Sequence, residues 1–150
     1  FSNLEKGNKI REEHIEKYVG INKEYNIFAL QKALAQKQKS RSIEILNYFL
    51  NNLNTNPMPM LNGDLFSYFK KVAITQSMMR STDREIMAAI GIPQFFINEY
   101  RQAATNFGGK KILKVIEALN DCDLKFKGIK ESTGDQRGIF EETILKILSL

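Results

Sequence analysis

The sequence has very few of the side chains on which metal and disulfide chemistry depend. Its 150 residues include one cysteine, Cys122, and one histidine, His14. A single cysteine excludes an internal disulfide framework, and one histidine leaves no plausible zinc ligand set. We therefore expect no metal and no other cofactor, and we find no candidate catalytic residue in this chain.

Long apolar runs are also missing. No segment approaches the roughly 18 apolar residues that a membrane span requires, and the N-terminus lacks the pattern of a secretory signal. Apolar residues make up 43% and charged residues 26% of the chain, which is ordinary for a globular protein. We expect a cytoplasmic protein without a membrane partner. Because the chain begins with Phe1, we also expect it to be a piece of a longer protein.

The net charge of +5 permits contact with phosphate but does not by itself indicate nucleic-acid binding. Lysines and arginines are spread along the chain instead of forming a block, which favours an ordinary solvated basic surface. The run Gly108-Gly109-Lys110-Lys111 lacks the spacing, the Ser/Thr and the preceding strand of a phosphate-binding loop. ATP binding is therefore not expected. His14, among carboxylates, is interpreted as exposed, and Cys122 as a buried, unreactive thiol.

Apolar residues recur at helical spacing almost throughout, and no segment alternates as a half-buried strand does. The predicted fold is all-α, a multi-helix bundle. Helices are expected over about 12–19, 26–38, 40–53, 60–79, 82–90, 93–104 and 110–121, with a last one after Gly138. We expect eight residues at the centres of apolar stripes to be buried: Phe28, Leu46, Phe49, Leu65, Phe69, Ile90, Ile116 and Leu119.

Several local signals set the expected helix ends. Asn26 and Ser40 are candidate N-caps, and Thr82 with Glu85 forms a capping box. Gly91 is expected to end its helix and Pro93 to begin the next. The proline- and asparagine-rich stretch 52–59 and the glycine-containing stretch 128–138 are expected to be loops.

The stretch 86–97 has the rhythm of a helix-turn-helix. A reading helix presents polar or basic side chains near its N-terminus to base edges, whereas this one begins with Gln94-Phe95-Phe96. The two phenylalanines favour protein contact. A helix-turn-helix DNA-binding regulator is therefore the alternative function and not the leading one.

The order and spacing of six segments resemble the delta subunits of bacterial DNA polymerase III. None of them is a catalytic signature, and they carry the resemblance as a series over nearly the whole chain. The segments are 10–21, 25–34, 65–71, 89–96, 103–107 and 121–125.

This resemblance implies a clamp-loader subunit with an ATPase-like module, a small helical lid and a helical collar. Residues 1–23 would be the end of the lid and residues 24–150 the collar, whose helices pack against other clamp-loader subunits. The sliding clamp would be bound by the N-terminal module outside this chain. The resemblance also implies weak, sequence-independent contact with primed DNA, for which the candidates are Lys125, Phe126, Lys127 and Lys130.

Overall fold

The computed structural model describes residues 24–52, 57–132 and 134–150. These residues form α-helices and one short 3-10 helix, with no strand among them, which confirms the all-α prediction. No helix in this described part is both long and apolar enough to cross a membrane. The predicted helix at 12–19, with His14, lies outside the described residues.

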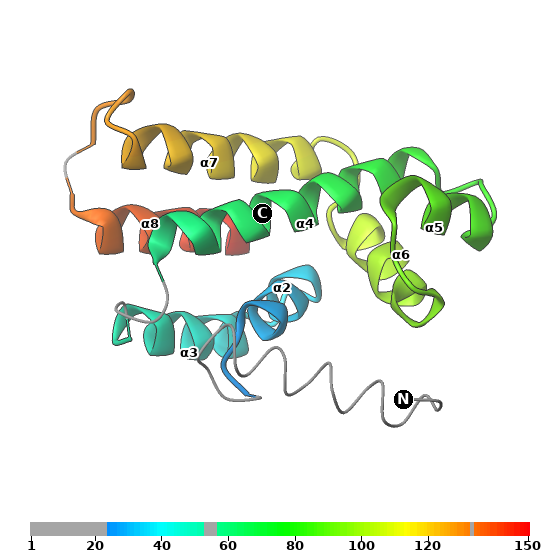
Figure 1. Cartoon of the computed structure of the whole chain (residues 1–150), viewed down its shortest axis with the longest axis horizontal. Helices are drawn as coiled ribbons and strands as arrows, with labels where there is room; N and C mark the ends of the chain where they lie inside the picture. The colour runs from blue at the N-terminus through cyan, green and yellow to red at the C-terminus, as the bar shows by residue number, and fades with distance from the viewer. Residues whose placement is uncertain (1–23, 53–56, 133) are drawn as a thin grey trace, which may run out of the picture.

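The order of the helices can be followed by colour in Figure 1. Their bounds are α2 Ile27–Ala35, α3 Lys39–Leu50, α4 Met58–Ser77, α5 Asp83–Ile90, the 3-10 helix Gln94–Phe96, α6 Ile97–Asn106, α7 Lys111–Phe126 and α8 Gln136–Leu148.

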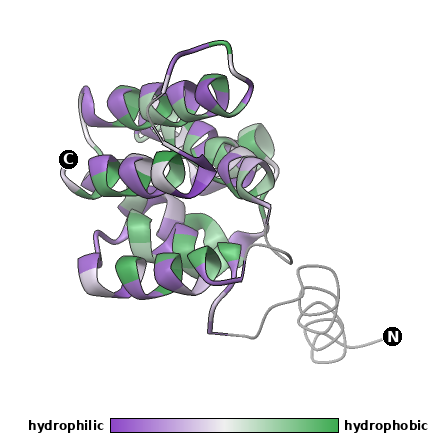
Figure 2. Ribbon diagram, turned by 90° about the vertical axis from the view of Figure 1, so that its left-hand side faces the viewer, coloured by the Kyte–Doolittle hydropathy of each residue, from purple (hydrophilic) through white to green (hydrophobic). Residues whose placement is uncertain are grey.

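The longest helix, α4, lies at the centre of the bundle and contacts α2, α5, α6, α7 and α8. Its side chains Leu61, Leu65, Phe69 and Val72 are fully buried. Helices α7 and α8 pack against each other along one side of α4, and the pair α2 and α3 lies on another (Figure 1). Because α4 packs against several helices, its buried face is wider than that of a surface helix, although one side of it stays exposed. The other helices carry both apolar and polar residues along their length, as Figure 2 shows.

Three predicted helix ends are confirmed, and each depends on atoms only a few residues apart. The Asn26 side chain accepts a hydrogen bond from the Ala29 amide at 2.8 Å. Thr82 and Glu85 form the reciprocal bonds of a capping box. Gly91 ends α5 with φ of +67°, in the left-handed region that glycine enters without steric cost.

Two predicted helix starts are wrong. Helix α3 begins at Lys39 after Gln38, so Ser40 lies inside it and is not its cap. Helix α4 begins at Met58 and contains Pro59 in its first turn. Proline is accepted there because the first-turn amides have no intrahelical acceptor, so the loop is shorter than predicted.

Two further boundaries also differ. Pro93 precedes the 3-10 helix, and α6 starts only at Ile97. Helix α8 starts at Gln136, where the Asp135 side chain accepts a hydrogen bond from the Gly138 amide at 2.9 Å. The last three residues of the predicted loop 128–138 therefore belong to α8.

The core prediction is confirmed for six of its eight residues and wrong for Phe28. The Phe28 side chain is 47% exposed, because α2 turns Ile27, Leu30 and Leu34 inward instead. Ile116 is half-buried and packs against the core. Cys122 is buried, as predicted.

Candidate functional site

The predicted DNA-contact residues lie together at the C-terminal end of α7. The backbone there closes in a Schellman motif, in which the Ile129 amide donates to the Leu124 carbonyl and the Gly128 amide to the Lys125 carbonyl. Gly128 has φ of +73°, as this motif requires at the position after the cap. The chain therefore leaves α7 in a defined direction.

Two of the three candidate lysines are engaged with aspartates of the same helix. Lys127 Nζ lies 2.8 Å from an Asp123 carboxylate oxygen, and Lys130 Nζ lies 3.0 Å from one of Asp121. Exposed pairs of this kind contribute about 0–1 kcal/mol, so phosphate could displace the aspartates. The aspartates nevertheless cancel part of the positive potential on which such binding depends.

The other two candidates are less exposed. Lys125 is half-buried and lines a shallow depression with the acidic residues Glu131 and Glu142. Phe126 is half-buried and packs against the core. The structure thus brings all four candidates to one edge, where the Phe126 ring also ends the apolar stripe of α7.

The α5–α6 unit holds its Arg101 side chain in internal contacts. The one basic side chain of α6, Arg101, lies 2.7 Å from Asp83 and also donates to the carbonyls of Met79 and Ser81. Glu99 lies near the N-terminus of α6, where its negative carboxylate would repel DNA phosphates. This arrangement does not favour a reading helix.

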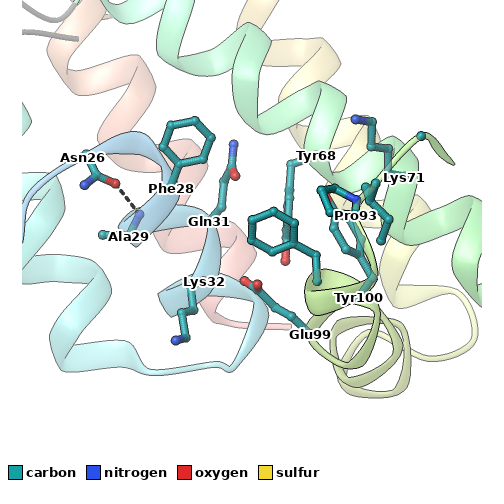
Figure 3. A pocket seen from close by; sticks show the side chains of 13 residues that line it. Asn26, Phe28, Ala29, Gln31, Lys32, Tyr68, Lys71, Pro93, Glu99 and Tyr100 are labelled. Carbon is teal, nitrogen blue, oxygen red and sulfur yellow. Dashed lines mark hydrogen bonds between the residues drawn. The ribbon is translucent and has the colours of Figure 1, made fainter. Parts of the chain in front are cut away.

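A groove of about 480 Å³ lies where α2, α4 and the start of α6 meet, and Figure 3 shows its lining. We call it the α2–α4–α6 groove. Its walls combine aromatic rings with a few polar tips. The residues that matter for its chemistry are Phe28, Gln31 and Lys32 of α2, Tyr68 and Lys71 of α4, and Phe96, Glu99 and Tyr100. A second depression continues from it over Asp64 and Ser67.

Side-chain bonds to backbone carbonyls hold α6 in place beside this groove. Asn106 donates to the Ala35 carbonyl at the end of α2, at 2.8 Å. Gln76 of α4 donates to the Phe107 carbonyl at 2.7 Å. The rings of Tyr68 and Tyr100 pack with their centroids 5.1 Å apart. The helical walls of the groove are therefore fixed by packing, and the short connection Gly91 to Pro93 completes the lining.

Two polar groups of the groove lack partners. The Tyr68 side chain is 5% exposed, yet its buried hydroxyl makes no hydrogen bond. Glu99 forms neither a hydrogen bond nor an ion pair within the described residues. Burial raises the pKa of its carboxyl above the ordinary value, although Lys32 opposes this. Burial also raises the pKa of Tyr68, and that of Tyr100 to about 12, so both phenols are neutral at physiological pH.

Sequence reasoning missed this groove. It placed Phe28 in the core and did not single out Tyr68, Tyr100 or Glu99. No local pattern marked Glu99, since a carboxylate in the first turn of a helix is common. Within the part of the chain that the structure describes, no group of three histidine, cysteine or acidic side chains could hold a metal ion.

Comparison with known proteins identifies one family. Residues 24–147 match the family model described as the C-terminal domain of the DNA polymerase III delta subunit. Comparisons with curated proteins and with solved structures yield no significant match. The matched region contains all the described helices apart from the last residue of α8. The chain therefore belongs to the family formed by the C-terminal domains of DNA polymerase III delta subunits.

Proposed function

We propose that this chain acts as the collar of a clamp-loader delta subunit, which helps to place the sliding clamp on primed DNA by holding the loader's subunits together. The collar would comprise residues 24–150, with residues 1–23 as the end of the lid. The observation that carries the proposal is the family match over residues 24–147. The setting is the bacterial cytoplasm, where the chromosome is replicated.

The surface of the bundle supports a role in assembly. Packing against a neighbouring helix needs apolar side chains on outer helix faces, because burying apolar area is the main favourable term in association. Helix α4 carries Met60 and Ile74, exposed by 48% and 40%, and α7 carries Leu113, exposed by 62%. These residues offer contact area on two sides of the bundle.

The test is competition for assembly. Purified chain is mixed with the other loader subunits and with full-length delta, and complexes are resolved by native mass spectrometry. We expect the chain to enter the complex in place of full-length delta. Failure of the chain to enter any complex, at concentrations at which full-length delta assembles, would refute the assembly role.

We further propose that Lys125, Lys127 and Lys130 make weak phosphate contacts with primed DNA held by the assembled loader, with Phe126 as a candidate for stacking on an unpaired base. The support is their position on one edge around the defined C-terminal end of α7. The opposing aspartates limit the contacts to weak ones. The lysine–phosphate contacts do not distinguish one DNA sequence from another, because the phosphates are the same at every base.

Replacing all three lysines by glutamine in the assembled loader tests this contact. Losing three phosphate contacts should flatten the log-log dependence of DNA affinity on salt by about 2 to 3 units. The matched control replaces Lys110, Lys111 and Lys114 at the opposite end of α7 by glutamine. Equal slopes for the two triple variants would remove the predicted edge from the DNA interface.

A further inference from the structure

The α2–α4–α6 groove has the features of a binding site and not of a packing defect. Its volume of about 480 Å³ falls in the range of ligand-binding clefts, and three separate helices build it. Aromatic rings supply the walls, and one buried polar atom without a hydrogen-bond partner, the Tyr68 hydroxyl, lies among them. Buried polar groups are nearly always hydrogen-bonded, so an exception indicates a partner that the isolated chain does not contain.

The unpartnered groups are both suited to accept hydrogen bonds from a cation. In Figure 3 the Tyr68 hydroxyl and the Glu99 carboxylate point toward each other and into the groove. The carboxylate is an acceptor only, and a neutral phenol oxygen can accept as well as donate. A donor placed between them would satisfy both.

The positive charges near the groove do not neutralise Glu99. Lys32 and Lys71 line the groove, but neither forms an ion pair with Glu99. In Figure 3 the ammonium group of Lys32 points away from the groove. The carboxylate is therefore half-buried and only partly compensated by Lys32, and a cationic partner at hydrogen-bond distance would compensate it further.

Flat walls favour a guanidinium over an ammonium group. The rings of Phe28, Tyr68 and Tyr100 line the groove together with Glu99. A guanidinium is planar, stacks on aromatic faces and carries five donors in a fixed fork, whereas an ammonium is a compact and strongly hydrated charge. The groove is larger than one side chain, which leaves room for the backbone on either side of it.

We propose that the α2–α4–α6 groove binds an arginine side chain presented by a neighbouring polypeptide of the assembly, with Glu99 and Tyr68 accepting the guanidinium hydrogen bonds. The source of the arginine, another member of the loader, rests on the proposed function. The chemistry of the groove does not, because it follows from residues of this chain alone.

The test uses the whole chain, labelled with ¹⁵N, and three probes followed by nuclear magnetic resonance: the N-acetyl methylamides of arginine, lysine and leucine. We expect the arginine probe to shift the amides around Gly91 and Tyr100 saturably, with a Kd on the order of millimolar, as for a single side chain. The lysine probe should bind several-fold more weakly, about as expected for a point charge without the fork.

Two variants sharpen the test. Glu99→Gln keeps the shape of the side chain and should weaken arginine binding by about tenfold or more, since it removes a charge-assisted hydrogen bond. Tyr68→Phe should weaken it by about threefold. The control Glu141→Gln removes an exposed carboxylate of α8 outside the groove and should change nothing.

The proposal is overturned if the arginine probe shifts these amides no more than the leucine probe does. The same result is expected if another part of this chain, or a second copy of it, fills the groove. It is equally overturned if Glu99→Gln binds as tightly as the unaltered chain. Neither result touches the assembly role, which fails only if the unaltered chain does not enter the loader. A Glu99→Gln chain that folds, fails to bind the probe and assembles poorly would support both.

Discussion

Replacing Phe69 by alanine should remove a large part of the stability of the domain. The Phe69 side chain is fully buried at the centre of α4, and its ring packs edge-on against Tyr68 and Phe107 with centroids 5.2 and 5.5 Å away. Phenylalanine-to-alanine changes in cores cost about 3 to 5 kcal/mol, and each aromatic pair adds about 0.5 to 1.5 kcal/mol beyond its buried area. Because five helices contact α4 and Phe69 itself is fully buried, the cavity cannot collapse easily, and we expect a cost of about 4 to 5 kcal/mol.

The matched control is Phe28→Ala. The sequence pattern predicts both phenylalanines to be buried, whereas the structure buries Phe69 and leaves Phe28 exposed. Phe28 is 47% exposed, so its replacement should cost about 1 kcal/mol. Urea unfolding followed by far-ultraviolet circular dichroism measures both free energies, with unchanged m-values as the check that only stability has changed. A difference of less than about 2 kcal/mol between the two variants would refute the packing described for α4.

Three further predictions concern single sites. Gly91→Ala forces a Cβ into the left-handed backbone region and should cost about 1 to 2 kcal/mol in urea unfolding; no loss would contradict the φ of +67°. Because burial raises the pKa of the Cys122 thiol to about 11, it stays protonated at about pH 8, and iodoacetamide should modify the native chain far more slowly than the urea-unfolded chain; equal rates would contradict its burial. Glu99→Gln should stabilise the isolated chain at neutral pH, since burial raises the pKa of that carboxyl and its ionised form opposes folding. This gain should shrink as the pH falls through the folded pKa, because the unaltered carboxyl is then neutralised, and a destabilised variant at neutral pH would contradict the reasoning.

The sequence predicts helix ends well where the relevant atoms are close along the chain. The cap at Asn26, the box of Thr82 and Glu85 and the turn at Gly91 each depend on residues no more than four apart, and all three are confirmed. The same reasoning fails at Pro59, because a proline is compatible with both a loop and a first helical turn. What decides between them is whether Met58 can be buried, and this depends on distant helices.

The groove could not be predicted, because its parts come from three segments far apart in the sequence. Apolar spacing on α2 makes Phe28 a plausible core residue, and only the angle at which α2 meets α4 and α6 turns it toward the groove. Likewise, Glu99 lies at the border of the buried face of α6, which carries Ile97, Tyr100, Ala103 and Ala104. Periodicity identifies that face, but it does not reveal what the remaining face meets.

Among the described residues, one other buried polar side-chain atom has no hydrogen-bond partner, the amide oxygen of the Asn62 side chain. Asn62 has a structural reason to be there, since its amide nitrogen donates to the Leu119 carbonyl at 3.0 Å and ties α4 to α7. The Tyr68 hydroxyl makes no such bond, and Glu99 makes none either. Replacing Tyr68 by Phe and Glu99 by Gln removes an unsatisfied hydroxyl and a half-buried charge and leaves the apolar packing intact, so the double variant should be more stable than the unaltered chain.

The same double variant should lose affinity for the arginine probe, because both acceptors are gone. A gain in unfolding free energy together with a loss of binding identifies groups that reduce stability and serve recognition, a pattern known from functional sites in general. A structural role for Tyr68 and Glu99 predicts the reverse for stability. Unfolding and probe titration on one protein sample therefore decide between the two roles, and a double variant that is less stable than the unaltered chain would show that these side chains hold the fold.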